Sequence, residues 1–184
     1  MRVVGGQLRG RKLLAPDPRW PVKPTADRTR EAIFDLLGPG LSGEAALDLF
    51  AGTGALGIEA LSRGFQTAVF VEQDRKVLSL VQKNLELCRL GERARVACRE
   101  VLSFLRRDAS SPGPFDLVLL DPPYGKGLVT PVLKLLVAPG WLGPGARVVA
   151  EAEARFVFPE EVGILVRHKE RRYGAAQVAI YQAV

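Results

Sequence analysis

Histidine, cysteine and methionine are scarce in this sequence of 184 residues. It contains one histidine, His168, two cysteines, Cys88 and Cys98, and one methionine. A single histidine nearly excludes catalytic triads, histidine-rich metal sites and most histidine acid–base chemistry. Two cysteines make neither a disulfide framework nor a zinc cluster, so we expect both to be ordinary core residues. Any chemistry in this chain must rest mainly on carboxylates, and we expect no metal.

Long apolar segments are also missing. No apolar run approaches the ~20 residues that span a bilayer, and the first residues lack the apolar core of a secretory signal. The chain is nevertheless 47% hydrophobic, which is enough for a full core, and its length fits one domain with a small extension. The sequence therefore predicts a soluble, cytoplasmic protein, which we expect to be a monomer without a membrane partner.

Positive charge is concentrated near the N-terminus. Residues 1–30 hold eight basic and two acidic residues, whereas the remaining 154 residues hold 18 of each. The whole net charge of +6 therefore lies in the first 30 residues. A basic segment beside a neutral domain favours a polyanionic partner, with nucleic acid first and a membrane surface second. We expect a basic extension at residues 1–40 and a main domain at residues 41–184.

The order of apolar runs and breakers predicts the fold class. Residues 1–15 are typical of a hairpin, residues 16–24 of a proline-rich loop, and a helix follows that Thr25 or Asp27 can cap and Gly38 ends. Strands are expected at 45–50, 67–71, 94–98, 115–120 and 146–151, and helices at 54–64, 75–90, 101–108 and 128–138. This alternation predicts an α/β fold with a mostly parallel sheet and helices on both faces. Residues 163–170 and 176–182 should add an antiparallel hairpin at the sheet edge, making seven strands.

The expected strand 115–120 ends in Asp121-Pro122-Pro123-Tyr124. Two prolines cannot continue a sheet ladder, so a carboxylate, a rigid turn and an aromatic ring stand at the carboxyl end of a strand. Ligands bind at that edge in open α/β sheets. Such a run arises by chance on the order of once in a hundred chains of this length. A plain proline turn is the alternative, and the functional interpretation requires a cofactor site upstream.

A glycine-rich turn, Gly52-Thr53-Gly54, joins the first parallel strand to its helix. Glycines let a backbone approach a ligand closely, and a helix N-terminus offers free N–H groups. Glu72 ends the next strand, where a carboxylate can accept both hydroxyls of a ribose. The same pattern also fits a nicotinamide dinucleotide, or a tight turn without a ligand.

Two further acids favour S-adenosylmethionine. Asp48, at the mouth of the turn, would repel a pyrophosphate but suits an ammonium group. Glu100 follows the third strand and can accept a hydrogen bond from an adenine amino group. Three acids at successive strand ends fit a cationic sulfonium nucleoside better than an anionic dinucleotide.

In order and spacing these motifs resemble those of class I S-adenosylmethionine-dependent methyltransferases that modify exocyclic amino nitrogens. Two N-terminal segments, Gly5-Gly6-x-x-Arg9-Gly10-Arg11-Lys12-Leu13 and Pro24-Thr25-x-Asp27-Arg28-x-Arg30-Glu31, more narrowly resemble the bacterial 16S rRNA guanine-N2 methyltransferases of the RsmD type. The stretches 54–63 and 103–105 are also similar to that family. The resemblance covers nearly the whole chain. It implies a Rossmann-like class I methyltransferase fold for residues 41–184, S-adenosylmethionine without a metal, and a 16S rRNA guanine in an assembled or assembling 30S subunit as substrate.

The resemblance also implies roles for individual residues. For the cofactor these are Asp48, Phe50, Gly52, Thr53, Gly54, Glu72, Gln73, Glu100 and Val101. Catalysis is assigned to Asp121 and the Pro122 carbonyl, which accept the amino hydrogens, and to Tyr124, which stacks on the base. RNA phosphates should be contacted by Arg9, Arg11, Lys12, Arg28, Arg30, Lys126, Arg171 and Arg172.

Other interpretations stay open at this point. An adenine-N6 DNA methyltransferase shares Asp-Pro-Pro-Tyr, although such enzymes usually carry an added target-recognition region. A protein amide methyltransferase usually has Asn where this chain has Asp121. A non-catalytic nucleic-acid-binding module on the same scaffold would fail to bind S-adenosylmethionine, and a dehydrogenase would bind a nicotinamide instead.

Overall fold

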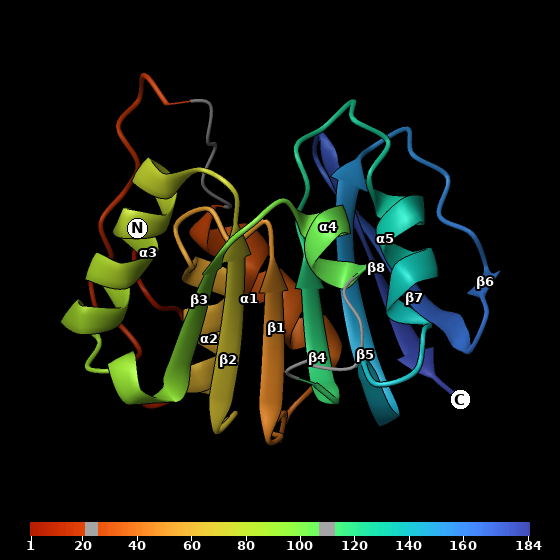
Figure 1. Cartoon of the computed structure of the whole chain (residues 1–184), viewed down its shortest axis with the longest axis horizontal. Coiled ribbons are helices and arrows are strands. Elements are labelled where there is room, and N and C mark those ends of the chain that lie inside the picture. The colour runs from red at the N-terminus through yellow and green to blue at the C-terminus, as the bar shows by residue number, and fades with distance from the viewer. Residues whose placement is uncertain (21–25, 107–112) are drawn as a thin grey trace.

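A single sheet of eight strands forms the centre of the computed structural model, which describes residues 1–20, 26–106 and 113–184. The strand order is β3-β2-β1-β4-β5-β8-β7-β6 (Figure 1). The strands span Ala45–Leu49 (β1), Thr67–Glu72 (β2), Ala94–Cys98 (β3), Phe115–Leu120 (β4), Leu142–Glu153 (β5), Glu161–Val162 (β6), Leu165–Tyr173 (β7) and Ala176–Ala183 (β8). Strands β1 to β5 pair in parallel, whereas β5–β8, β8–β7 and β7–β6 are antiparallel. The order reverses between β1 and β4, which is the point where open α/β sheets bind ligands.

Helices cover both faces of this sheet. They span Asp27–Leu37 (α1), Ala55–Ser62 (α2), Arg75–Leu87 (α3), Val101–Leu105 (α4) and Val129–Leu136 (α5), with a short 3₁₀ turn at Gly91–Arg93. Successive residues of a strand point to opposite faces. In β4, Leu117 and Leu119 join the hydrophobic cluster that contains α1, α2 and α3, whereas Val118 and Leu120 join the cluster with α4 and α5. The expected doubly covered α/β fold is confirmed.

The differences from the expected elements are local. Strand β5 begins at Leu142 rather than at residue 146, and its register with β4 shifts between the Phe115–Leu142 and Leu117–Arg147 pairs. A two-residue strand, β6, adds an eighth strand outside the hairpin, so β7 lies inside the sheet and β6 forms its edge. Helix α1 ends just before Gly38 as expected, whereas α2, α3 and α5 end two or three residues earlier than expected. The end of the helix expected at 101–108 lies outside the described residues.

The start of α1 corrects one expectation. The N-cap position is held by Ala26, whose methyl group cannot accept a hydrogen bond, and Asp27 is the first helical residue. Asp27 therefore does not cap the helix; its carboxylate is used elsewhere, as described below. The other expected cap, Thr25, lies outside the part of the chain that the structure describes.

The N-terminal segment packs on the main domain. Its hairpin has one bridge, Arg2 with Lys12, and a Gln7 N–H that donates to the Ser62 carbonyl oxygen of α2 at 2.8 Å. A Cβ at Gly6, where φ is +71°, would overlap that same carbonyl oxygen. The glycine pair therefore allows the hairpin to lie directly on α2. The functional division at residue 40 stays a prediction.

Candidate active site

Five neighbouring parallel strands carry an acid at or near their carboxyl ends. From β3 to β5 these are Glu100, Glu72, Asp48, Asp121 and Glu151. Leu49 of β1 and Ala150 of β5 both pair with Leu120 of β4, so the acids of these three strands are brought to one edge of the sheet. Sequence reasoning selected the first four and missed Glu151. The same rule, an acid at the end of an expected strand, would have found it.

The glycine-rich turn after β1 is tightly wound. Phe50, Gly52 and Gly54 have φ values of +61°, +56° and +77°. A positive φ is unusual for a phenylalanine and typically marks a site under backbone strain. The Gly52 N–H donates to Glu72 Oε2 at 3.2 Å, and the Ala51 N–H donates to the Val71 carbonyl oxygen at 2.9 Å. These bonds bring the turn against the end of β2.

Asp48 lies beneath this turn rather than open at its mouth. Its side chain is buried, with 1% of the residue exposed, and Oδ2 accepts a hydrogen bond from the Gly57 N–H of α2 at 2.8 Å. Burial raises the pKa of Asp48 well above its ordinary value, and the nearby carboxylates of Asp121 and Glu72 raise it further, against the opposing effect of the Gly57 bond. A cation placed here would be stabilised by three carboxylates.

The remaining residues of the cofactor prediction lie along β2 and β3. Glu72 Oε1 accepts from the Asp74 N–H at 2.9 Å, and the Gln73 carbonyl oxygen accepts from the Cys98 thiol at 3.6 Å. Glu100 caps α4, because its two oxygens accept from the Leu102 N–H at 2.9 Å and the Ser103 N–H at 2.6 Å. Val101 begins α4 and is buried.

The pKa of Glu100 reflects this capping role. Its partial burial alone would raise the pKa, but the hydrogen bonds from Leu102 and Ser103 and the charge of Arg106 together lower it below the ordinary value. The carboxylate therefore stays charged, and an ionised carboxylate can accept further hydrogen bonds beside the two that cap the helix.

The Asp121–Tyr124 turn borders a hollow at the same edge. Asp121 is half-buried, Pro122 is buried, and Tyr124 is 44% exposed. The hollow measures about 230 Å³, including its open side, with Pro122–Gly125 along one wall and Ala152, Glu153 and Phe156 on the other.

Tyr124 is held by the acid that the sequence analysis missed. Its hydroxyl donates to Glu151 Oε1 at 2.8 Å, and Glu151 is only 6% exposed. Partial burial, the hydrogen bond and the negative charge of Glu151 raise the pKa of Tyr124 well above its ordinary value. The phenol therefore stays protonated and remains a donor.

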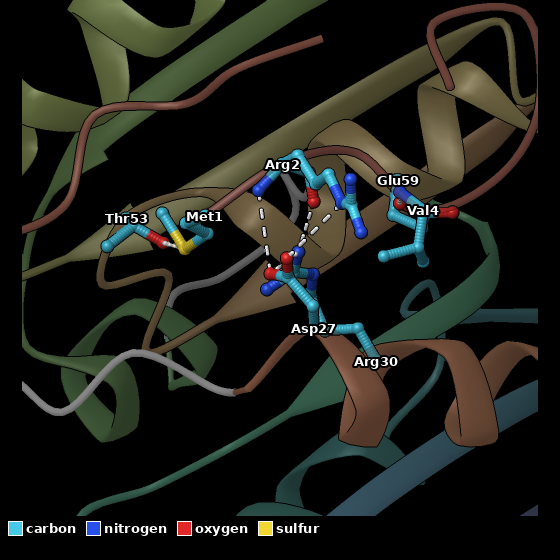
Figure 2. A network of polar contacts seen from close by, with 7 residues as sticks. All are labelled: Met1, Arg2, Val4, Asp27, Arg30, Thr53 and Glu59. Carbon is cyan, nitrogen blue, oxygen red and sulfur yellow. Dashed lines mark hydrogen bonds and ion pairs between the residues drawn. The ribbon is translucent and has the colours of Figure 1, made fainter. Parts of the chain in front are cut away.

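The structure corrects one of the expected RNA contacts. Arg30 is fully buried, and its guanidinium pairs with Asp27 Oδ1 at 2.8 Å and donates to the Arg2 carbonyl oxygen. Figure 2 shows this cluster between α1 and the N-terminal segment. Arg30 thus connects α1 to the N-terminal segment and cannot reach a phosphate. The i,i+3 spacing of Asp27 and Arg30 was the signal that could have indicated the pair.

The other expected RNA contacts are exposed: Arg9, Arg11, Lys12, Arg28, Lys126, Arg171 and Arg172. The side chains of two of them, on β7, also donate hydrogen bonds to backbone carbonyl oxygens of the described chain. Arg171 donates to the Glu170 carbonyl oxygen at 2.9 Å, and Arg172 donates to the Ala154 carbonyl oxygen just after β5. Arg172 therefore also supports the loop that follows β5.

A buried asparagine ties the N-terminal segment to the glycine-rich turn. The Asn84 side chain accepts from the Leu14 N–H at 2.7 Å and donates to the Thr53 carbonyl oxygen at 2.9 Å. The Thr53 hydroxyl in turn lies 3.8 Å from the Met1 sulfur, a contact that Figure 2 shows. Sequence reasoning did not select Asn84. It is the chain's only asparagine and falls on the apolar face of the expected helix 75–90, which was the available signal.

Within residues 1–20, 26–106 and 113–184, no helix is long and apolar enough to cross a membrane. In the same ranges, no three or more His, Cys, Asp or Glu side chains are grouped so that they could hold a metal ion.

Comparison with known proteins gives similarities over nearly the whole chain. The model of the family described as conserved hypothetical protein 95 matches residues 1–182. Ribosomal RNA small subunit methyltransferase D of Escherichia coli (strain K12) is 38% identical over 182 residues, which cover 99% of this chain and 89% of that protein. The protein of the same name from Haemophilus influenzae is 36% identical over 185 residues, covering 99% and 93%. A solved Escherichia coli structure described as a methyltransferase has a TM-score of 0.87 and 38% identity, over 100% of this chain and 97% of that one. These similarities favour none of the alternatives that the sequence left open.

Proposed function

This chain belongs to the conserved hypothetical protein 95 family, that of the ribosomal RNA small subunit methyltransferases D, and we propose that it transfers a methyl group from S-adenosylmethionine to the exocyclic N2 amino group of a guanine in 16S rRNA. The single observation that carries this proposal is the position of Asp121-Pro122-Pro123-Tyr124. The motif ends β4 at the point where the strand order reverses, beside the acids of β1 and β2.

The residues present fit S-adenosylmethionine. The negative charges of Asp121 and Glu72 lie close enough to raise the pKa of Asp48. A sulfonium or ammonium group would relieve that repulsion. We expect Glu72 to accept hydrogen bonds from ribose hydroxyls and Glu100 to accept one from an adenine amino group. When bound, the cofactor supplies an already activated methyl group, so the protein has to contribute positioning and electrostatics.

The acceptor nitrogen of guanine has its lone pair delocalised into the ring. The Asp121 carboxylate and the Pro122 carbonyl can each accept one amino hydrogen, which turns the lone pair toward the methyl group and stabilises the positive charge that develops on attack. Tyr124 presents its ring at the hollow, where it can stack on the base. A paired guanine would have to leave its helix to reach this position.

Affinity for RNA comes from the exposed basic side chains. Arg9, Arg11 and Lys12 lie on the N-terminal hairpin, and Lys126 lies two residues after Tyr124. Phosphate contacts of this kind give strong, salt-dependent binding without reading the sequence. Because ribosomal RNA is the substrate, we also propose an assembled or assembling 30S particle as partner and a cytoplasmic location, and we keep the expectation of a monomer.

A methylation assay tests the proposal. Small subunits or 16S rRNA that lack the modification are incubated with the protein and labelled S-adenosylmethionine, and the rRNA is digested and analysed by mass spectrometry. The expected product is one N2-methylguanine. Label in adenine or in ribosomal protein, or no label at all, would contradict the proposal. Parallel reactions with particles and with free 16S rRNA identify the substrate form.

A further inference from the structure

Strand β5 extends beyond its neighbour β4 at the carboxyl edge of the sheet. Strand β4 ends at Leu120, opposite Ala150, whereas β5 continues to Glu153. Figure 1 shows β5 reaching past β4 there. The added residues pair with β8 instead, through Glu151 with Val178, Ala152 with Gln177 and Glu153 with Ala176. The C-terminal hairpin therefore supports a piece of strand that forms one wall of the hollow.

The loop after this extension is fastened to the same hairpin. The Ala154 N–H donates to the Ala175 carbonyl oxygen at 2.9 Å, and Arg172 and Gln177 donate to the carbonyl oxygens of Ala154 and Phe156. The Phe156 ring packs edge-on against Phe158 with 4.9 Å between the ring centres. The C-terminal hairpin consequently holds this wall of the hollow through hydrogen bonds.

Glu151 connects this wall to the Asp121–Tyr124 turn. Asp121 follows Leu120 and Glu151 follows Ala150, so the two acids occupy neighbouring strand positions. The Tyr124 hydroxyl, 27 residues away in sequence, donates to Glu151 Oε1 at 2.8 Å, while much of Tyr124 remains exposed. A buried carboxylate thus holds one end of an aromatic side chain whose remainder faces the solvent.

We propose that Glu151 is a positioning residue for methyl transfer, which holds the Tyr124 ring through its hydroxyl in the orientation that meets the acceptor base. This inference rests on the proposed function, in which the base stacks on the Tyr124 ring. A ring fixed in advance loses little side-chain freedom when the base stacks on it, whereas a released ring has to be ordered at that moment. In this role Glu151 acts through the Tyr124 hydroxyl rather than on the reacting atoms.

A double-mutant cycle tests this role. Glu151→Ala, Tyr124→Phe and the double variant are compared with wild type for kcat/KM toward small subunits at saturating cofactor, and cofactor affinity is titrated for each. Each single variant is expected to lose roughly tenfold in kcat/KM, about the value of one charge-assisted hydrogen bond, with cofactor affinity unchanged. The double variant should lose no more than either single one, because both remove the same bond. Glu151→Gln, which keeps an acceptor oxygen, should recover most of the activity that Glu151→Ala loses.

Several outcomes would overturn the inference. If the single losses multiply in the double variant, or if Glu151→Ala methylates like wild type, Glu151 does not act through Tyr124. Should Glu151→Ala fail to fold, Tyr124→Phe decides alone: full activity would overturn the inference, and a roughly tenfold loss at unchanged cofactor affinity supports it. The control is Glu161→Ala, an exposed acid of β6, which should leave every value unchanged. If wild type itself methylates no rRNA, the proposed function fails, which is a separate result.

Discussion

The two halves of the carboxyl edge use their acids differently. On the cofactor half, Asp48, Glu72 and Glu100 all accept hydrogen bonds from backbone N–H groups of nearby turns and helix starts. On the acceptor half, Glu151 accepts from the side chain of Tyr124 on a neighbouring strand end. The first half is built mainly from local turns, and the second from strands brought together by the sheet. This difference indicates that the acceptor half depends more on the register between neighbouring strands.

The largest effect is expected at the boundary between the halves, in Asp121→Ala. Loss of the acceptor for the amino hydrogens should lower turnover by a factor of roughly a hundred to a thousand, while cofactor affinity changes little. Single-turnover methylation and a cofactor titration measure the two quantities. Normal methylation by this variant would show that Asp121 takes no part in methyl transfer.

Asp48→Asn tests the cofactor half. In the folded protein the pKa of Asp48 is raised above its ordinary value of 3.8. The contribution of its protonated carboxyl group to the free energy of unfolding is therefore fully present below pH 3.8, and it is lost as the pH rises through the raised pKa. Asparagine keeps an oxygen for the Gly57 N–H but cannot ionise. The variant should therefore be more stable than wild type at neutral pH without cofactor, and should bind S-adenosylmethionine roughly tenfold more weakly. Thermal unfolding from pH 4 to 8 and a cofactor titration check this, and identical pH profiles for both proteins would contradict it.

The N-terminal segment is tied to the cofactor half only through Asn84, Thr53 and α2 among the contacts described above, so its basic side chains should act on RNA alone. Replacing Arg9, Arg11 and Lys12 with alanine should weaken particle binding and lower the slope of log K against log salt by up to ~3. Filter binding at several salt concentrations measures the slope.

The buried Arg30 provides the matched control for that experiment. Arg30→Ala should lower the free energy of unfolding by about 1–3 kcal/mol and leave the salt slope as in wild type. An unchanged slope in the triple variant, or a reduced slope in Arg30→Ala, would reverse the roles assigned to exposed and buried arginines.

The smallest effect concerns how closely the N-terminal hairpin lies on α2. Gly6→Ala would overlap the Ser62 carbonyl oxygen and strain a positive φ, and should cost about 1–3 kcal/mol of stability. Gly10→Ala is the control, since its φ is also positive but an added Cβ there meets open space in the described chain. It should cost about 1 kcal/mol or less. Equal losses in urea unfolding would show that only φ matters.

The sequence predicted the ends of the strands better than the contacts between them. Gly52 and Asp121 follow strands whose apolar pattern is visible in the sequence, and Glu72 is the last residue of another. The Tyr124–Glu151 bond depends on the register of β4 and β5, which periodicity alone does not give. Arg30 was misassigned because charge in a sequence does not reveal burial, and β6 was missed because two residues carry no periodic signal.

The central claim is that the Asp121–Tyr124 turn methylates a guanine amino group of 16S rRNA. Mass mapping of rRNA after incubation with wild type or Asp121→Ala tests it most directly. Wild type should add 14 Da, the mass of one net methylene, to a single guanine at N2, and Asp121→Ala should add essentially none. Methylation at another atom, or equal methylation by both proteins, would contradict the account.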